Sequence, residues 1–286
     1  MVNPLFCYFW ELYYNLPQTM ELQFYTPESE ILKDFIEGYY FIREEKIPKK
    51  IQYFTFPNNY KILSVNQSTT VHVERNRFIV SLSGDGKITS ELVCSYTSPL
   101  EIIYEQAVNE VTIYFKPLGL NHFIDNTDIF SEKTVVNFFP FPDFRDTMKA
   151  IFEQPERKEQ IRQLEHYLLS KLQKRDLSVI AQIVADVETG LKIEDIAEKH
   201  GLARQSIRRM FLKHVGKTPS EYRKIFRFRN AITEYGKSNN LTDLSYGNLF
   251  YDQSHFIKDF RTLTNTNPGS FFDNVDTEKG NVWLFV

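Results

Sequence analysis

Residues 201–222 read GLARQSIRRMFLKHVGKTPSEY, and residues 250–268 read FYDQSHFIKDFRTLTNTNP. The second stretch repeats the pattern of the first at an interval of 49 residues, which separates Phe211 from Phe260. The matched pairs are Ile207 with Phe256, Arg209 with Lys258, Phe211 with Phe260, and Pro219 with Pro268. Apolar residues three or four apart, followed by a Pro, are typical of one helix, a turn and the start of another. We therefore predict two similar helical units joined by one long helix.

The spacing of small and apolar residues in the first unit suits a helix-turn-helix. Gly201 follows Ala197 by four residues, and Ile207 follows Gly201 by six. A small Ala lets two helices cross closely, a Gly accepts positive φ in the turn, and Ile207 anchors the second helix. An ordinary helical hairpin shares this spacing, so the polar residues must decide. Thr218 and Glu221 form a predicted capping box for the next helix.

The outward faces of the two second helices carry side chains suited to reading bases. Arg pairs with guanine and Gln with adenine in the major groove, whereas most protein–DNA hydrogen bonds go to the backbone. The predicted DNA-contacting residues are Arg204, Gln205, Arg208 and Arg209 in the first unit, and Gln253, Ser254, His255 and Lys258 in the second. Lys217 and Arg223 are predicted to contact phosphates. Asp252 is placed to cap the second of these helices.

Charge is distributed unevenly along the 286 residues, although the whole chain has a net charge of only −3. Residues 174–272 contain 16 Lys and Arg against 11 Asp and Glu, and residues 203–230 contain nine basic residues and one acid. A charge run is usually a solvated face, but this one stands inside an acidic protein. It indicates a polyanion partner for the C-terminal part alone.

The remaining chain predicts an α+β protein with an N-terminal antiparallel β barrel or sheet domain, a helical linker, and a C-terminal all-α domain. Short alternating runs such as RFIVSLS and EVTIYFK indicate strands, and SGDGK at 83–87 is predicted to be a hairpin turn. An apolar helical stripe after residue 143 packs on its own domain or forms a dimer contact. The predicted segments are an extension or upstream readthrough at 1–19, a β-rich sensor domain at 20–140, the linker at 141–175, the helical domain at 176–275, and a tail at 276–286.

The two units resemble the DNA-binding domain of AraC/XylS-type transcriptional regulators over about residues 177–272, with DQSHF at 252–256 as the strongest part. The resemblance implies double-stranded DNA as partner, RNA polymerase as a second partner and, often, transcriptional activation. The stretches TPESEILKDFIEGYYF, FPNNYKILSV and IYFKPLGLNHF resemble the β-rich sensor domain that precedes some such units, which implies a small-molecule effector. This similarity begins near Met20. Leu249 in place of Gly, and Phe271-Phe272 in place of Tyr-Arg, depart from the family pattern.

No catalytic or metal-binding arrangement is apparent in the sequence. The β region holds only His72 and His122, which are not paired as a metal cupin requires, and no phosphate or dinucleotide motif occurs. We therefore expect no enzyme activity, no cofactor, no metal and no membrane segment, and a cytoplasmic location. The alternative function is a ligand-sensing or protein-interaction module that binds DNA weakly or non-specifically. Operator, effector, sign of regulation and homodimer formation stay open.

Overall fold

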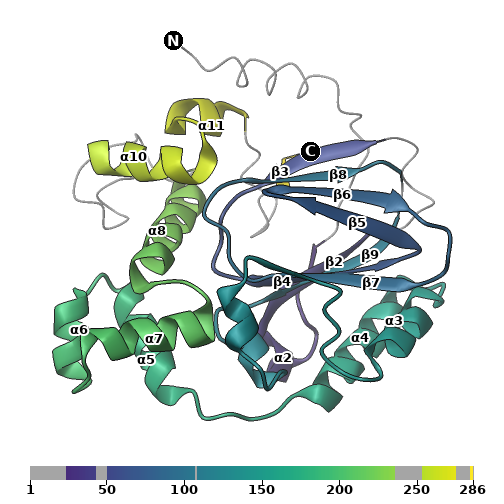
Figure 1. Cartoon of the computed structure of the whole chain (residues 1–286), viewed down its shortest axis with the longest axis horizontal. Helices are drawn as coiled ribbons and strands as arrows, with labels where there is room; N and C mark the ends of the chain where they lie inside the picture. The colour runs from purple at the N-terminus through teal and green to yellow at the C-terminus, as the bar shows by residue number, and fades with distance from the viewer. Residues whose placement is uncertain (1–23, 43–49, 107, 236–252, 275–283, 286) are drawn as a thin grey trace.

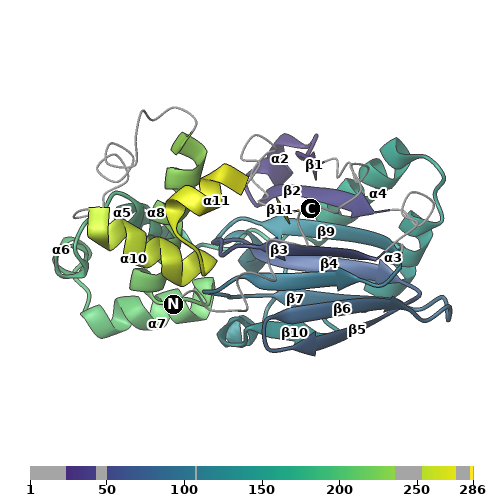
Figure 2. The ribbon, with the colours of Figure 1, turned by 90° about the horizontal axis from the view of Figure 1, so that it is seen from above.

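The structure is a computed structural model that describes residues 24–42, 50–106, 108–235, 253–274 and 284–285. A β domain made of two sheets is followed by a helical domain (Figure 1). The helical domain lies beside one end of the sheets rather than above them (Figure 2). This arrangement confirms the predicted α+β class, with two open sheets in place of a closed barrel.

The first sheet has six strands in the order β1-β2-β9-β4-β7-β10, and all its pairs are antiparallel. In that order the strands are Phe24–Tyr25, Ile36–Ile42, Asn109–Phe115, Lys61–Gln67, Ile88–Val93 and Thr134–Val136. They are rich in the β-branched and aromatic residues that suit a pleated, buried surface. The central strands β4 and β9 are buried along most of their length because side chains cover both faces of the sheet.

The second sheet has five strands in the order β11-β3-β8-β6-β5. In that order the strands are Leu284–Phe285, Ile51–Thr55, Leu100–Tyr104, Arg77–Leu82 and Thr69–Glu74. One pair, β6 with β8, is parallel, which departs from the antiparallel arrangement expected. The reason is that the chain crosses to the first sheet to form β7 between these two strands.

The SGDGK segment is not the hairpin turn that the sequence suggested. It joins β6 in the second sheet to β7 in the first, so it crosses between sheets. Gly84 and Gly86 both take positive φ there, at 67° and 69°, which other residues adopt only with strain. The short hairpin lies instead between β5 and β6, where Arg75 has a φ of 49°. The Gly-rich segment therefore predicted correctly that the chain turns here, but not which strands the turn connects.

Aromatic side chains fill much of the space between the sheets. Tyr40, Tyr53, Tyr104 and Tyr114 are all buried in one cluster. Among them lies Glu110, whose Oε2 accepts a hydrogen bond of 2.8 Å from the Tyr104 hydroxyl. Burial raises the pKa of Glu110, because little solvent is present to stabilise the charged form. These tyrosines therefore take part in packing and in a buried polar network.

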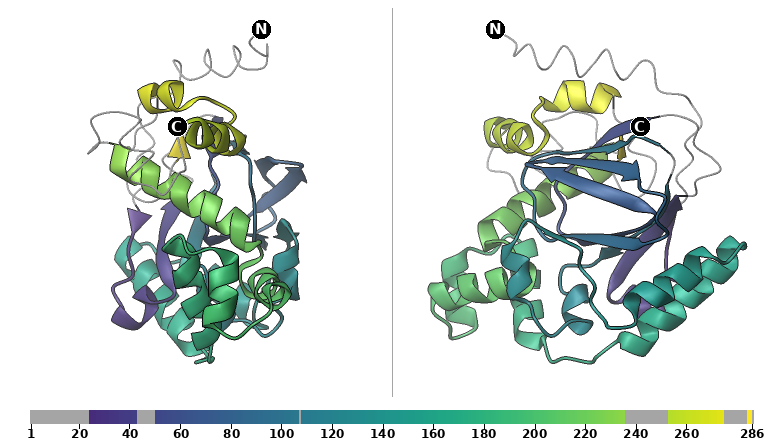
Figure 3. Two further views of the ribbon diagram at one scale, coloured as in Figure 1. Left: turned by 90° about the vertical axis from the view of Figure 1, so that its left-hand side faces the viewer. Right: turned by 45° about the vertical axis from the view of Figure 1, so that its right-hand side comes forward.

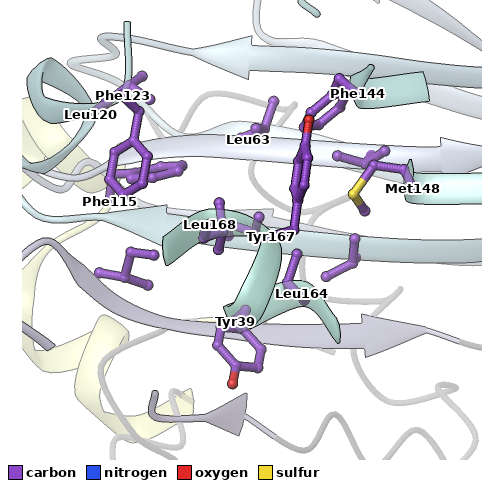
Figure 4. Packing of buried hydrophobic residues seen from close by; sticks show 14 of the residues in the cluster. Tyr39, Leu63, Phe115, Leu120, Phe123, Phe144, Met148, Leu164, Tyr167 and Leu168 are labelled. Carbon is purple, nitrogen blue, oxygen red and sulfur yellow. The ribbon is translucent and has the colours of Figure 1, made fainter. Parts of the chain in front are cut away.

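The apolar helical stripe packs on its own domain, as the first of the two sequence interpretations expected. Helices α3 (Phe144–Phe152) and α4 (Arg157–Lys171) lie against the outer face of the six-stranded sheet (Figure 3). Met148 and Leu164 are fully buried with Leu63 of β4 in this core (Figure 4). The segment expected to be a linker is therefore part of the β domain's hydrophobic core.

One carboxylate also ties α4 to the start of the domain. Glu165 accepts hydrogen bonds from the backbone amides of Glu28 and Ser29 at 2.7 and 2.9 Å, and from the Tyr39 hydroxyl. Ser29 precedes the short helix α2 (Glu30–Lys33), so Glu165 satisfies amides that the helix start leaves unpaired. Glu165 of α4 thus joins the start of α2 to strand β2 through hydrogen bonds.

The helical domain follows α4 and contains both predicted units. Its helices are α5 (Ser178–Glu188), α6 (Ile193–Lys199), α7 (Arg204–Val215), α8 (Pro219–Tyr235), α10 (Gln253–Thr264) and α11 (Pro268–Asn274). Short 3₁₀ turns, η2 (Gly119–His122) and η3 (Asp128–Ser131), reach it from the β domain. No helix in the described part of the chain is long and apolar enough to span a membrane. The expected extension at 1–19 lies outside the described residues.

Leu164→Ala tests whether α4 belongs to the β domain's core. Leu164 is fully buried, so its truncation should lower the free energy of unfolding by about 2–5 kcal/mol. Lys158→Ala on the same helix removes an exposed side chain and should change it by less than about 0.5 kcal/mol. Urea unfolding followed by tyrosine fluorescence measures both. Equal stability of the two variants would show that α4 is not part of that core.

Candidate DNA-binding surface

The first helix-turn-helix has the geometry that its sequence spacing predicted. Ala197 on α6 is buried, and Ile207 on α7 is fully buried. Gly201 lies in the turn between them with a φ of 62°. A Cβ at this Gly would meet nothing, so the backbone conformation and not crowding favours glycine. The buried side of α7 continues through Phe211 and Val215, at intervals of four residues.

The opposite side of α7 faces solvent with all four predicted reading residues. Arg204, Gln205, Arg208 and Arg209 are exposed. Arg204 forms an exposed ion pair of 2.9 Å with Glu194 of α6. An exposed pair of this kind contributes little stability, so the guanidinium can exchange Glu194 for another anion at small cost.

The second unit places α10 in the same way. Phe256 and Phe260 are buried, whereas Ser254 and Lys258 are exposed. The side chains of Gln253 and His255 lie outside what the structure describes, as do Leu249 and Asp252. The structure therefore brings two of the four predicted residues of this unit to one exposed helix face.

Sequence reasoning missed Arg261 on that face. Ser254, Lys258 and Arg261 follow one another at intervals of four and three residues on α10, and together with Ile257 and Thr262 they line one shallow hollow. Residues at these intervals lie on the same side of a helix. The helical spacing of Arg261 from Ser254 and Lys258 is visible in the sequence, but no DNA contact was predicted for Arg261.

The repeat extends to the ends of the helices. Gly216 ends α7 with a φ of 76°, and Asn265, 49 residues later, follows α10 with a φ of 59°. Asn accepts this left-handed conformation better than most residues, so the two units end alike despite the substitution. The following helices also begin alike, with Pro219 and Pro268 as their first residues.

Both of these helices are capped by side chains just before the proline. Thr218 and Glu221 exchange hydrogen bonds, from the Thr218 amide to Glu221 at 2.8 Å and from the Glu221 amide to Thr218 at 3.2 Å. This is the predicted capping box. In the second unit the Ser270 amide donates to Asn267 Oδ1 at 2.9 Å. The two units therefore repeat each other in structure as well as in sequence.

The departure at Phe271-Phe272 is absorbed by packing. Both rings are buried in one cluster with Phe228 of α8 and Phe260 of α10. Phe271 stands 49 residues after Tyr222, which is buried in the first unit. The second unit therefore keeps an aromatic residue at the matching core position, and α10 remains anchored to the core.

Five of the nine basic residues in the 203–230 stretch do not face solvent freely. Lys217 is 1% exposed, so the prediction that it contacts phosphates is wrong for this arrangement. Arg223, also predicted to contact phosphates, donates to the backbone carbonyls of Val187 and Leu191. The other three are Lys224 and Arg227, both paired with Asp259, and Arg229. The basic surface therefore comes mainly from α7 and α10, not from α8.

The loop between β3 and β4 joins the β domain to both units. Phe56 lies in the hydrophobic cluster of the second unit, with its ring 5.1 Å from that of Phe271. Arg229 of α8 donates to the carbonyls of Phe56 and Pro57. Asn59 donates to the Tyr222 carbonyl at 3.1 Å. A few consecutive residues thus touch the core and the backbone of the helical domain.

Lys61, at the start of β4, contacts the end of the first recognition helix. Its Nζ donates to the Val215 carbonyl at 2.9 Å and lies 4.0 Å from the centre of the Phe130 ring. The last carbonyls of a helix carry partial negative charge, so an ammonium group is stabilised there. Next to them, a Cβ on Gly216 would come within 2.5 Å of the Phe130 carbonyl, which shows how closely α7 approaches η3.

Two lysines are buried together at this contact. Lys61 and Lys217 are each 1% exposed, and Lys217 Nζ has no hydrogen-bond partner among the described residues. Burial lowers the pKa of Lys61 to about 7, and the charge of Lys217 adds to that shift. Burial likewise lowers the pKa of Lys217 to about 8. The contact between domains therefore contains two groups that titrate near neutral pH.

No group of three or more His, Cys, Asp or Glu side chains that could hold a metal ion occurs within the described ranges.

No curated protein matches the chain. Among solved structures, ToxT from Vibrio cholerae is 13% identical, with 82% of this chain and 97% of ToxT aligned and a TM-score of 0.43. A ToxT structure from Vibrio cholerae strain SCE256, described as bound to an unsaturated fatty acid, is 12% identical, with 90% and 96% aligned and a TM-score of 0.43.

The family comparison concerns the C-terminal part of the chain alone. Residues 196–274 match a family model described as a helix-turn-helix domain. The matched range begins in α6 and ends with α11, so it includes both recognition helices and the helix between them. The C-terminal part of this chain is a helix-turn-helix domain of the AraC type.

Proposed function

We propose that this chain is a sequence-specific DNA-binding transcriptional regulator in which the β domain controls two DNA-reading helices. The observation that carries the proposal is one design used twice: α7 and α10 each expose a polar face, end in a left-handed residue and precede a capped helix that begins with Pro. The two lie near opposite ends of α8 (Figure 1). The reader corresponds to about residues 176–275 and the sensor to about 20–140, now with α3 and α4 added to its core.

The exposed chemistry differs between the two helices. Three guanidinium groups and Gln205 are exposed on α7, whereas α10 exposes Ser254, Lys258 and Arg261. Guanidinium and amide groups make paired hydrogen bonds with base edges, and hydroxyl and ammonium groups suit phosphates and single contacts. We infer that α7, with three guanidinium groups and one amide, supplies more of the sequence discrimination than the described side chains of α10, among which Arg261 alone carries a guanidinium.

Control by the β domain has a physical route in the contacts of residues 56–61. Phe56 is packed in the core of the second unit, and Lys61 holds the end of α7. Any shift of this loop changes contacts with both readers. We further propose activation through RNA polymerase and control by a small-molecule effector, both of which the family resemblance implies.

Substitutions on α7 test the reading role. Gln205→Ala and Arg208→Ala should each lose about 1–3 kcal/mol of binding to the preferred sequence and relax preference at one base pair. Lys213→Ala, an exposed control on the same helix, should weaken binding to all sequences alike. Selection from a random DNA pool, followed by affinity measurements at fixed salt, separates the two outcomes. Identical selected sequences for all variants would favour the alternative of a module with non-specific DNA binding.

The distance between the readers predicts the operator's layout. The 17 residues of α8 span about 25 Å, which leaves the recognition helices able to enter neighbouring major-groove segments about 34 Å, or 10 bp, apart. A monomer should therefore need two different half-elements on one DNA face. Inserting 5 bp between them should abolish specific binding, and inserting 10 bp is the matched control for length. Unchanged affinity after the 5-bp insertion would mean that one unit alone reads DNA.

The two buried lysines predict how contact between the domains responds to pH. If the domains separate, both ammonium groups reach solvent and return towards the ordinary pKa of 10.5. The separated state then binds more protons than the docked state from about pH 7 upward. Contact between the β domain and the helical domain should therefore strengthen as pH rises from 7 to 8.5, and its strength should stay nearly constant below about pH 6.5. Neighbouring titratable groups are Cys94, His214 and Glu221.

Thermal unfolding between pH 6.5 and 8.5 measures this dependence. The double variant Lys61→Met and Lys217→Met should flatten the rise of Tm with pH, because neither side chain can then bind a proton. Lys213→Met removes an exposed lysine from α7, the helix that ends just before Lys217, and should leave the slope as in the wild type. An unchanged slope in the double variant would show that these lysines do not titrate on docking.

A further inference from the structure

A groove far from the recognition helices has the features of a small-molecule site. Its volume is about 480 Å³, within the usual range for such sites. Residues of β5, β7, the end of β10 and α3 line it. Helix α3 lies at the opposite end of the β domain from α7 (Figure 1). The lining residues of the groove are Thr69, Thr70, Val71, Asp85, Gly86, Lys87, Ile88, Thr89, Glu91, Val136, Asn137, Arg145, Asp146 and Lys149.

Glu91 is the most buried ionisable residue in this lining. It is 3% exposed, and its described hydrogen bond is a long one, 3.4 Å from Asn66 Nδ2. The Oδ1 atom of Asn66 has no hydrogen-bond partner among the described residues. Burial, together with the charge of Glu110, raises the pKa of Glu91 to about 8. A neutral carboxyl group can donate one hydrogen bond and accept others, which suits a ligand hydroxyl.

Two cationic side chains stand at the edge of the groove. Arg145 and Lys149 are exposed, four residues apart on α3, so they lie on the same side of that helix. The Arg145 guanidinium carbon lies 3.8 Å from the centre of the Phe139 ring, which orients the group and leaves its N–H edges available. Within the described residues, neither side chain forms an ion pair, whereas Lys87 is paired with Asp85.

We propose that this groove binds a small hydroxylated acid, with its acidic group on Arg145 and Lys149 and a hydroxyl group on Glu91. The hydroxyls of Thr69 and Thr89, 3.0 Å apart, supply further polar contacts beside Glu91. Val71, Ile88 and Val136 supply apolar surface for the carbon chain. Carboxylate and phosphate share the charge and geometry that Arg binds, so either can serve as the acidic group. The groove would recognise a metabolite that carries both functions, and binding requires no DNA.

Titration calorimetry on the full chain tests the proposal with defined probes. Gluconate offers a carboxylate with hydroxyls, and glycerol 3-phosphate offers a phosphate with hydroxyls. Propionate offers an acid without hydroxyls, and glycerol offers hydroxyls without an acid. At least one of the first two should bind with a Kd below about 10 mM, because each engages both ends of the groove, and the tighter one identifies the acidic group. Propionate and glycerol should bind at least about tenfold more weakly, since each lacks one contact to a charged or buried group.

Variants locate the binding. Lys149→Gln should weaken the better probe about tenfold, whereas Lys158→Gln, an exposed lysine on the neighbouring helix α4, should not change it. Glu91→Gln keeps a neutral donor and acceptor, so it should retain binding at pH 7. It should also remove the loss of affinity expected in the wild type above about pH 8. The charged groups that face Glu91's site are Asp85, Lys87, Arg145, Asp146 and Lys149, with Glu110 behind it.

Three results would overturn the assignment. The first is the absence of binding by both hydroxylated acids. The second is equal binding of propionate, which would show that the buried carboxyl contributes nothing. The third is equal weakening by Lys149→Gln and Lys158→Gln, which would indicate general attraction of anions to the surface. Tm values of the unliganded variants show whether each is folded, and a variant that is not folded is replaced by Arg145→Gln for the same comparison.

Discussion

Helix α8 is the element on which the DNA-binding half depends, because it belongs to two hydrophobic cores at once. Tyr222, near its start, is buried with α5, α6 and α7, and Phe228 and Ile232, further along, are buried with α10 and α11. A helix is stiff over this length, so sharing it sets the relative position of the two units. The charge of Asp259 on α10 adds to this by pairing with basic side chains of α8.

The burial of α8 in two hydrophobic cores also explains why this helix contributes little to the basic surface. A helix packed on several sides has few solvent-facing positions, and its long cationic side chains instead bind backbone carbonyls and a buried carboxylate. Arg229 shows both the cost of burying a cation away from water and the hydrogen bonds that offset this cost. Burial lowers its pKa to about 10, and it binds the loop carbonyls of Phe56 and Pro57. Charges that suggested a polyanion partner are thus partly structural, and the exposed basic side chains lie mainly on α7 and α10.

The β domain contacts this framework through the loop between β3 and β4 and through the turns η2 and η3, rather than through a broad sheet face. Phe56 contributes a buried ring, Asn59 a hydrogen bond, and Lys61 a buried amino group at a helix end. Buried polar groups are sensitive to small displacements, because a lost partner leaves the desolvation cost uncompensated. A contact of this kind is stable in one geometry and weak in neighbouring ones, which is the property that the proposed control of the helical domain by the β domain requires.

The sequence alone determined much of the helical half, because its signals are local. Periodic apolar residues placed α7 and α10, Gly201 supplied the positive φ expected of it, and Thr218 with Glu221 formed the expected cap. Exposure of Arg208 follows from the burial of Ile207 and Phe211 on the same helix.

Tertiary structure decided what depends on distant partners. The crossing of SGDGK between sheets, the parallel pairing of β6 with β8 and the inclusion of α4 in the β core all arise from contacts far apart in the chain. Lys217 shows the limit most clearly. Its position after a recognition helix suggested a phosphate contact, yet the approach of the β domain buries it beside Lys61. Local patterns specify a helix and its faces, but whether a face meets water, DNA or another domain depends on long-range packing.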